Sequence, residues 1–151
     1  MILSIWLASF MAMALPACQV LTPANVQVVV GAPVTIDASQ SGPGDDAGSD
    51  FCAWKTPAGR FIILGVYTNA SIAAARAKYA AQLVGAFGGG PAARAIANVG
   101  DEAQYRDYAG GQKGGVVVVR AGLFVVTLEG PMERAEILGL SNFVLARVGS
   151  H

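Results

Sequence analysis

Apolar and polar positions along the chain predict two groups of three strands, each run bounded by Gly, Pro or polar turn residues. The expected strands lie at 33–38, 50–56 and 60–68, then at about 103–108 and in two apolar runs within 116–128. The sequence "RAG" separates the last two runs. We expect a tight hairpin there, with Gly122 adopting a backbone angle that side chains disfavour.

Helical spacing of apolar residues predicts three helices, at 21–31, 69–87 and 130–148. The first has Thr22 as a cap and Pro23 at its first position. The sequence "GGGP" at 88–91 ends the second. The expected buried stripe of the second is Ile72, Ala75, Tyr79, Leu83 and Phe87, and that of the third is Ile137, Leu140, Val144 and Val148.

These elements follow the order α-βββ-α-βββ-α, which predicts the α+β class with a mostly antiparallel sheet of about five or six strands. The strands within 116–128 are apolar on both faces, so we expect helices to cover both faces of the sheet. The chain has 151 residues, which suits one domain, and we place it at 15–151.

The first 14 residues carry no charged side chain and end in "AMA", a small-x-small pattern typical of a leader-peptidase site. We therefore expect a signal peptide at 1–14 and an exported protein, periplasmic or at the cell surface. The absence of Lys or Arg near Met1 departs from the usual signal. An uncleaved membrane anchor and a buried first helix are the alternatives.

The chain has two cysteines, Cys18 and Cys52. An even number in an oxidising compartment favours a disulfide, which leaves no thiol over. The sequence "LPAC" also partly matches a lipoprotein processing site, so lipidation of Cys18 remains an alternative, as do two free thiols. Their spacing, with His151 as the only histidine, is unsuited to a metal site.

Composition and motifs exclude several classes of function. Ten basic residues balance ten acidic ones and are scattered, so no nucleic-acid partner is expected. A catalytic triad needs a histidine within the folded domain, but the only histidine, His151, is the last residue of the sequence. The carboxylates of "GDDAGSD" lack calcium-loop spacing, and Lys113 lacks the context of a phosphate loop. We expect no cofactor and no metal.

Three residues are candidates for a ligand site: Trp54, Asp101 and Glu102. Trp54 shares a strand face with Cys52, which favours a place in the core over one in an aromatic ligand wall. Asp101 and Glu102 follow a glycine at a turn, where strand-edge chemistry is the more common role. They are also the only carboxylates we single out for acid–base chemistry.

The segments "ACQVLTPANVQVVVG", "CAW", "VGDEAQYR" and "VVVVRAGLFVVTL" occur in an order that resembles a family of small exported bacterial domains of unknown function, often lipoproteins of actinobacteria. The resemblance implies a fold similar to PsbP-like sandwiches and no catalytic activity. It makes Cys18 part of the domain, which favours the disulfide. Asn98 departs from the pattern, because a glycine is common at that position.

We therefore expect a non-enzymatic accessory or interaction domain of the cell envelope. Its partner would be another envelope protein or a small apolar ligand held between sheet and helices. Membrane contact is expected only if the leader stays uncleaved or Cys18 is lipidated. The alternatives are a lipoprotein that scaffolds an envelope complex through Cys18 and, less favoured, a carboxylate-based enzyme.

Overall fold

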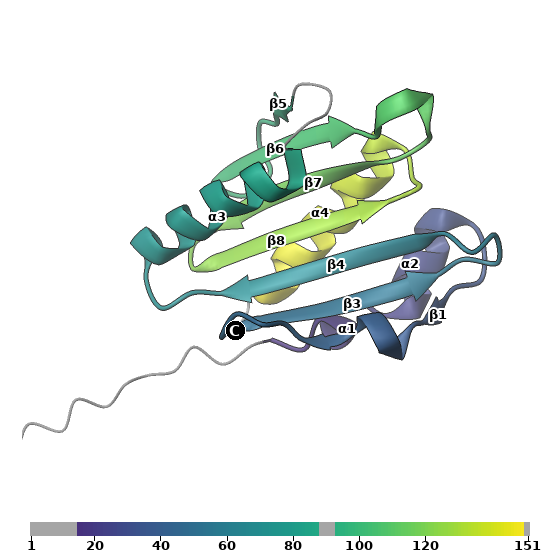
Figure 1. Cartoon of the computed structure of the whole chain (residues 1–151), viewed down its shortest axis with the longest axis horizontal. Coiled ribbons are helices and arrows are strands. Elements are labelled where there is room, and N and C mark those ends of the chain that lie inside the picture. The colour runs from purple at the N-terminus through teal and green to yellow at the C-terminus, as the bar shows by residue number, and fades with distance from the viewer. Residues whose placement is uncertain (1–14, 88–92, 150–151) are drawn as a thin grey trace, which may run out of the picture.

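The protein is described here from a computed structural model, which covers residues 15–87 and 93–149. The predicted signal peptide at 1–14, the "GGGP" segment and His151 lie outside these residues. The architecture is one antiparallel sheet with helices on both of its faces (Figure 1). This confirms the α+β class, the antiparallel sheet and the expected cover on both sides.

Among the described residues the sheet has eight strands, more than expected, because the two-residue strands at 42–43 and 94–95 were not predicted. They pair in the order β1-β3-β4-β8-β7-β6-β5, and β2 also pairs with β3. The strands are β1 (Thr35–Ile36), β2 (Gly42–Pro43), β3 (Ser49–Lys55), β4 (Phe61–Thr68), β5 (Arg94–Ala95), β6 (Glu102–Asp107), β7 (Gly115–Ala121) and β8 (Phe124–Gly130).

The described part of the chain also has four α-helices and two short 3-10 helices. They are α1 (Ala17–Val20), α2 (Pro23–Val30), α3 (Ile72–Phe87) and α4 (Arg134–Val148), with η1 (Ala38–Gln40) and η2 (Ala109–Gly111). In α2, Thr22 caps the helix as expected, accepting a hydrogen bond from the Asn25 backbone N–H. Gly31 ends it in the left-handed conformation at φ 70°.

The strand expected at 33–38 is much shorter in the structure. The Asp37 carboxylate accepts hydrogen bonds from the backbone N–H and the hydroxyl of Ser39 and thereby starts η1. The loop expected at 39–50 also contains β2, and α1 was not expected at all. The predicted order α-βββ-α-βββ-α is therefore correct only in outline.

The main core lies on the face of the sheet covered by α1, α2 and α4. The predicted stripe of the last helix is confirmed, because Ile137, Leu140, Val144 and Val148 are all buried there. A disulfide joins Cys18 of α1 to Cys52 of β3, with Cα atoms 5.0 Å apart. This bridge attaches the first helix to the sheet, and it is typical of proteins that fold in an oxidising compartment.

On the opposite face, α3 is the one helix among the described residues, and it packs on β7 and β8 (Figure 1). Ala75 and Tyr79 are buried beneath it, whereas Ile72, expected in the stripe, is 43% exposed. Ile72 is the first residue of the helix, shortly after β4 ends at Thr68. One helix cannot cover a face this wide, and β3 and β4 remain uncovered on this side in Figure 1.

No helix in the described part of the chain has the length and apolar content needed to cross a bilayer. Within residues 15–87 and 93–149, no group of three or more His, Cys, Asp or Glu side chains is arranged to hold a metal ion.

Candidate functional site

The structure separates the three predicted site residues. Trp54 is fully buried in the main core, on the same face of β3 as Cys52. Asp101 and Glu102 lie at the start of β6 on the other side of the sheet, beside Arg120 of β7. Trp54 therefore has a packing role and is not part of a ligand wall.

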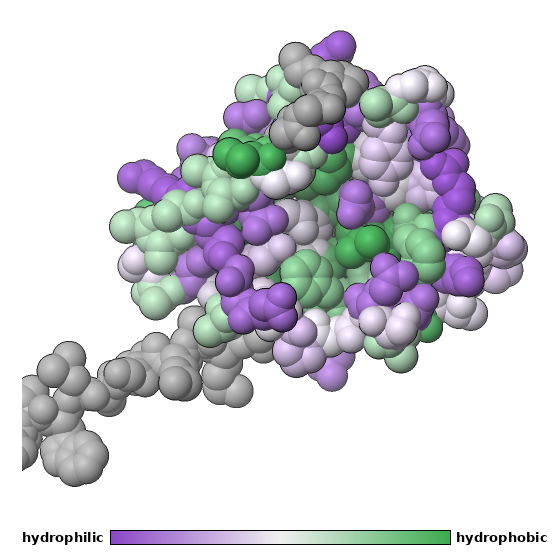
Figure 2. All heavy atoms as spheres, in the orientation of Figure 1, coloured by the Kyte–Doolittle hydropathy of each residue, from purple (hydrophilic) through white to green (hydrophobic). Residues whose placement is uncertain are grey.

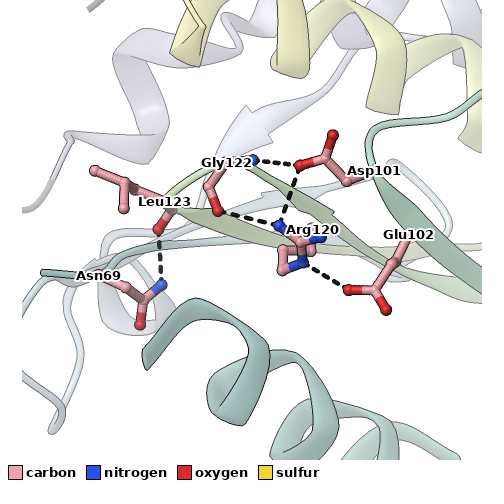
Figure 3. Close-up of polar contacts among 6 residues, drawn as sticks. All are labelled: Asn69, Asp101, Glu102, Arg120, Gly122 and Leu123. Carbon is pink, nitrogen blue, oxygen red and sulfur yellow. Dashed lines mark hydrogen bonds and ion pairs between the residues drawn. The ribbon is translucent and has the colours of Figure 1, made fainter. Parts of the chain in front are cut away.

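Asp101 and Glu102 hold a buried arginine. The Arg120 guanidinium donates from Nε to Glu102 Oε2 at 2.6 Å and from Nη1 to Asp101 Oδ2 at 3.1 Å (Figure 3). Asp101 Oδ2 also accepts from the Gly122 backbone N–H at 2.7 Å. The two carboxylates raise the pKa of Arg120. Both acids thus fix the β7–β8 turn, where Gly122 has the expected positive φ of 57°.

A second contact joins the same turn to the start of α3. The backbone N–H of Asn69 and its side-chain Nδ2 both donate to the Leu123 carbonyl, at 3.0 and 2.9 Å (Figure 3). This end of α3 is therefore anchored on the hairpin. It is a structural cluster, and neither Asp101 nor Glu102 lines the groove described next.

A groove of about 330 Å³ lies between the second half of α3 and the open part of the sheet. In Figure 2, which shows this side of the molecule, apolar residues are visible in a hollow beside α3 with hydrophilic residues around it. The lining residues are Phe51, Ile63, Tyr67, Gln82, Gly85, Ala86, Arg106, Tyr108, Val116, Thr127 and Glu129. Six of them are apolar or aromatic and four have polar or charged side chains, so the groove combines apolar surface with polar groups that could orient a ligand.

The floor of the groove follows from strand register. Glu129 of β8 is paired with Ile63 of β4 on one side and with Val116 of β7 on the other. Val116 is in turn paired with Arg106 of β6. Residues paired in this way point to the same face of a sheet. The floor is therefore one row across four strands in which an apolar residue flanks each charged one.

Aromatic rings form the wall of the groove nearest β3. The rings of Phe51 and Tyr67 meet edge to face, with centroids 5.6 Å apart. Gly65 is paired with Phe51 across the two strands, and a Cβ at Gly65 would lie 2.9 Å from the Phe51 ring. Because Gly65 has no side chain, the Phe51 ring can lie against the backbone of β4. The ring therefore does not fill the groove.

Several polar side chains that line the groove are partly removed from water. Burial raises the pKa of Glu129 above its ordinary value of 4.5, and burial is the only cause. Burial likewise raises the pKa of Tyr108 to about 12, with the nearby Glu129 adding to the effect. The Tyr67 hydroxyl donates to Gln82 Oε1 of α3 at 3.2 Å. No opposite charge among the described residues thus offsets the burial of Glu129.

The groove continues into a second hollow at the acidic loop before β3. Phe51 and Tyr67 line both, and Asp45 and Asp46 lie at the far side. Lys78 of α3 reaches across, with Nζ 2.7 Å from Asp46 Oδ2 and 5.5 Å from the centroid of the Tyr67 ring. An ammonium group is therefore already held by a carboxylate and an aromatic ring at this end.

An exposed apolar patch lies on the opposite side of the molecule, between α2 and α4. Val28 is 84% exposed and Phe143 is 36% exposed, next to Val29 and Leu140 in a shallow hollow. The patch carries almost no polar groups, so it differs in chemistry from the groove.

Sequence reasoning missed the groove and its residues. One signal was present: Val125, Thr127 and Glu129 alternate along β8 and so share a face. The side chains on this face become more polar towards Glu129. This pattern indicates that the face is not fully covered at that end of β8. Comparison with known protein families finds no family model that matches this chain, and no curated protein matches it either.

Proposed function

We propose that this chain is a non-enzymatic, exported domain of the cell envelope that binds a small, largely apolar ligand in the groove beside α3. The observation that carries this proposal is the contrast between the two sides of the sheet. One side is closed by three helices and a disulfide, whereas the other leaves aromatic and aliphatic side chains open in a groove. Membership of the exported family that the sequence resembles is part of the same proposal.

The arrangement of Cys18 favours a free domain over a lipoprotein. Lipoprotein processing would make Cys18 the first residue and remove Ala17. Ala17 is fully buried, and its backbone N–H donates to Asp50 Oδ2 at 2.6 Å. Lipid on Cys18 would also require the sulfur that is bonded to Cys52. The loss of the Ala17 contacts and the loss of the disulfide both argue against the lipoprotein alternative.

The enzyme alternative has little support. It relied on Asp101 or Glu102 acting as acid or base in a concave site. Both carboxylates instead bind Arg120 at the hairpin turn and are absent from the lining of the groove. An interaction with another envelope protein is the second candidate, because the Val28–Phe143 patch is exposed. Val28→Asp would then abolish cross-linking to that protein in the native host.

The binding function is tested by filling the groove. We expect 2-phenylethanol, a small and mostly apolar probe, to shift the methyl NMR signals of Ile63 and Val116 in the purified protein. Ala86→Phe places a ring in the groove from α3, so the shifts should disappear. Ala80→Phe adds the same ring on the exposed side of α3 and should leave them unchanged. Equal shifts in both variants would contradict binding in the groove.

A further inference from the structure

We propose that the groove beside α3 selects small organic cations that carry an apolar body, such as arylalkylammonium compounds, and that Glu129 binds the ammonium group. This inference rests on the proposed function, because it names the class of ligand for the same groove. It is carried by the position of Glu129 among apolar and aromatic neighbours.

Glu129 is a carboxylate for which the described residues provide no ion-pair partner. It lies between Ile63 and Val116 in the floor of the groove, and it forms no hydrogen bond or ion pair with another described residue. A carboxylate that is partly removed from water gains most from a partner that is both charged and able to donate hydrogen bonds. A ligand ammonium supplies both.

The surrounding rings favour the same class of ligand. Phe51, Tyr67 and Tyr108 line the groove, and the faces of aromatic rings attract cations. Lys78 provides an internal example, because its ammonium lies over the Tyr67 ring beside Asp46. Such a combination of carboxylate and aromatic ring suits an amine better than an anion.

Arg106 sets the orientation of the ligand. It lies on the far side of Val116 from Glu129, two strands away in the same row. A guanidinium repels a second cation, so the ammonium is held at Glu129 on the side away from Arg106. The apolar body of the ligand then lies over Ile63 and against Phe51, where the groove is aromatic.

The test compares three probes of nearly the same shape by NMR titration and calorimetry: 2-phenylethylammonium, 2-phenylethanol and phenylacetate. We expect the cation to bind at least tenfold more tightly than the alcohol, because a charge-assisted contact is worth about that ratio or more. Phenylacetate should bind most weakly. Glu129→Gln should bring the affinity for the cation down to that for the alcohol.

Glu133→Gln is the matched control, because it removes the same charge at an exposed helix start outside the groove. Thermal unfolding of both variants checks that they remain folded. Equal binding of cation and alcohol, or an unchanged cation affinity in Glu129→Gln, would overturn the inference and leave the binding function standing. Tighter binding of phenylacetate would do the same. Failure of all three probes to bind would overturn both.

Discussion

The Arg120 guanidinium donates from Nε to Glu102 Oε2 at 2.6 Å, while its side chain is only 7% exposed on the sheet face beneath α3. Such an arginine needs its partners, because a buried charge without them is unfavourable. Arg120 Nη1 donates hydrogen bonds to the Asp101 carboxylate and to the Gly122 carbonyl. The two acids that the sequence offered as acid–base candidates therefore serve this arginine and the turn beside it.

Arg120→Met should lower the free energy of unfolding by roughly 1.5–3 kcal/mol, the usual range for hydrogen bonds to charged groups. Arg120→Lys should recover only part of the loss, because an ammonium lacks the planar fork that reaches both carboxylates. Urea unfolding followed by circular dichroism measures both. Arg76→Met, on the exposed side of α3, is the control and should change little. Equal losses at Arg76 and Arg120 would contradict the assignment.

The Cys18–Cys52 disulfide should contribute about 3–4 kcal/mol to stability, since it closes a loop with a sequence separation of 34 residues. The double variant Cys18→Ser with Cys52→Ser should show that loss in urea unfolding. The intact mass of the protein from its native host, with and without reductant, tests the chemistry directly. A gain of two hydrogens on reduction supports the bridge, whereas a chain that starts at Cys18 with added acyl mass refutes it.

Glu129→Gln should stabilise the protein at neutral pH. The folded protein has a raised pKa at Glu129, so it holds the proton more tightly than the unfolded chain does. Below pH 4.5 the carboxyl is protonated in both states and the variant gains nothing. As the pH rises through the raised pKa, ionisation destabilises the folded wild type, and the advantage of Gln appears.

Melting temperatures of the wild type and Glu129→Gln between pH 4 and pH 8 give the measurement. The groove also contains Arg106 and two tyrosines. Burial raises the pKa of Tyr108 to about 12 and that of Tyr67 above its ordinary value of 10. Neither tyrosine titrates in this range, so the change belongs to Glu129. A constant difference across the range would rule out the raised pKa.

Trp54→Ala should cost about 3–5 kcal/mol, as expected when a fully buried aromatic side chain is removed from a core. Groove probes should leave the fluorescence of Trp54 unchanged, since the ring lies on the other side of the sheet from the groove. Fluorescence titration of Trp6→Phe, in which Trp54 is the one tryptophan, checks this point. A marked change on adding 2-phenylethylammonium would return Trp54 to the ligand site.

Gly100→Ala should destabilise the protein by more than about 1 kcal/mol. Gly100 has a φ of +59°, and an added Cβ would lie 2.6 Å from the Arg120 carbonyl oxygen. Gly139→Ala is the matched control: nothing lies within 4 Å of its Cβ, and alanine favours the α4 helix by about 0.5–1 kcal/mol. Opposite signs in thermal unfolding are expected, and a loss in both would contradict this account.

The turn before β6 contains Asn98 in the left-handed conformation. Asn98 has a φ of +63°, the only positive value among the described non-glycine residues. Asparagine tolerates this left-handed conformation better than most side chains do.

Local patterns were enough to predict the α+β class, the long strands, the buried stripe of α4, the capped helix after Thr22 and the tight turn at Gly122. Each depends on neighbours within a few residues, where side-chain period and backbone angle act directly. Local patterns did not predict β2, β5 or α1, because edge pairing and the contacts of Ala17 depend on distant partners.

The groove was decided by the tertiary structure alone. Its floor joins residues of four strands that are adjacent only through pairing, and its depth depends on how much of the sheet α3 covers. The same is true of Asp101 and Glu102, whose role changed once β7 placed Arg120 beside them. Charge and residue type are properties of the sequence, whereas burial and partners, which decide what a charge does, arise only when the chain is folded.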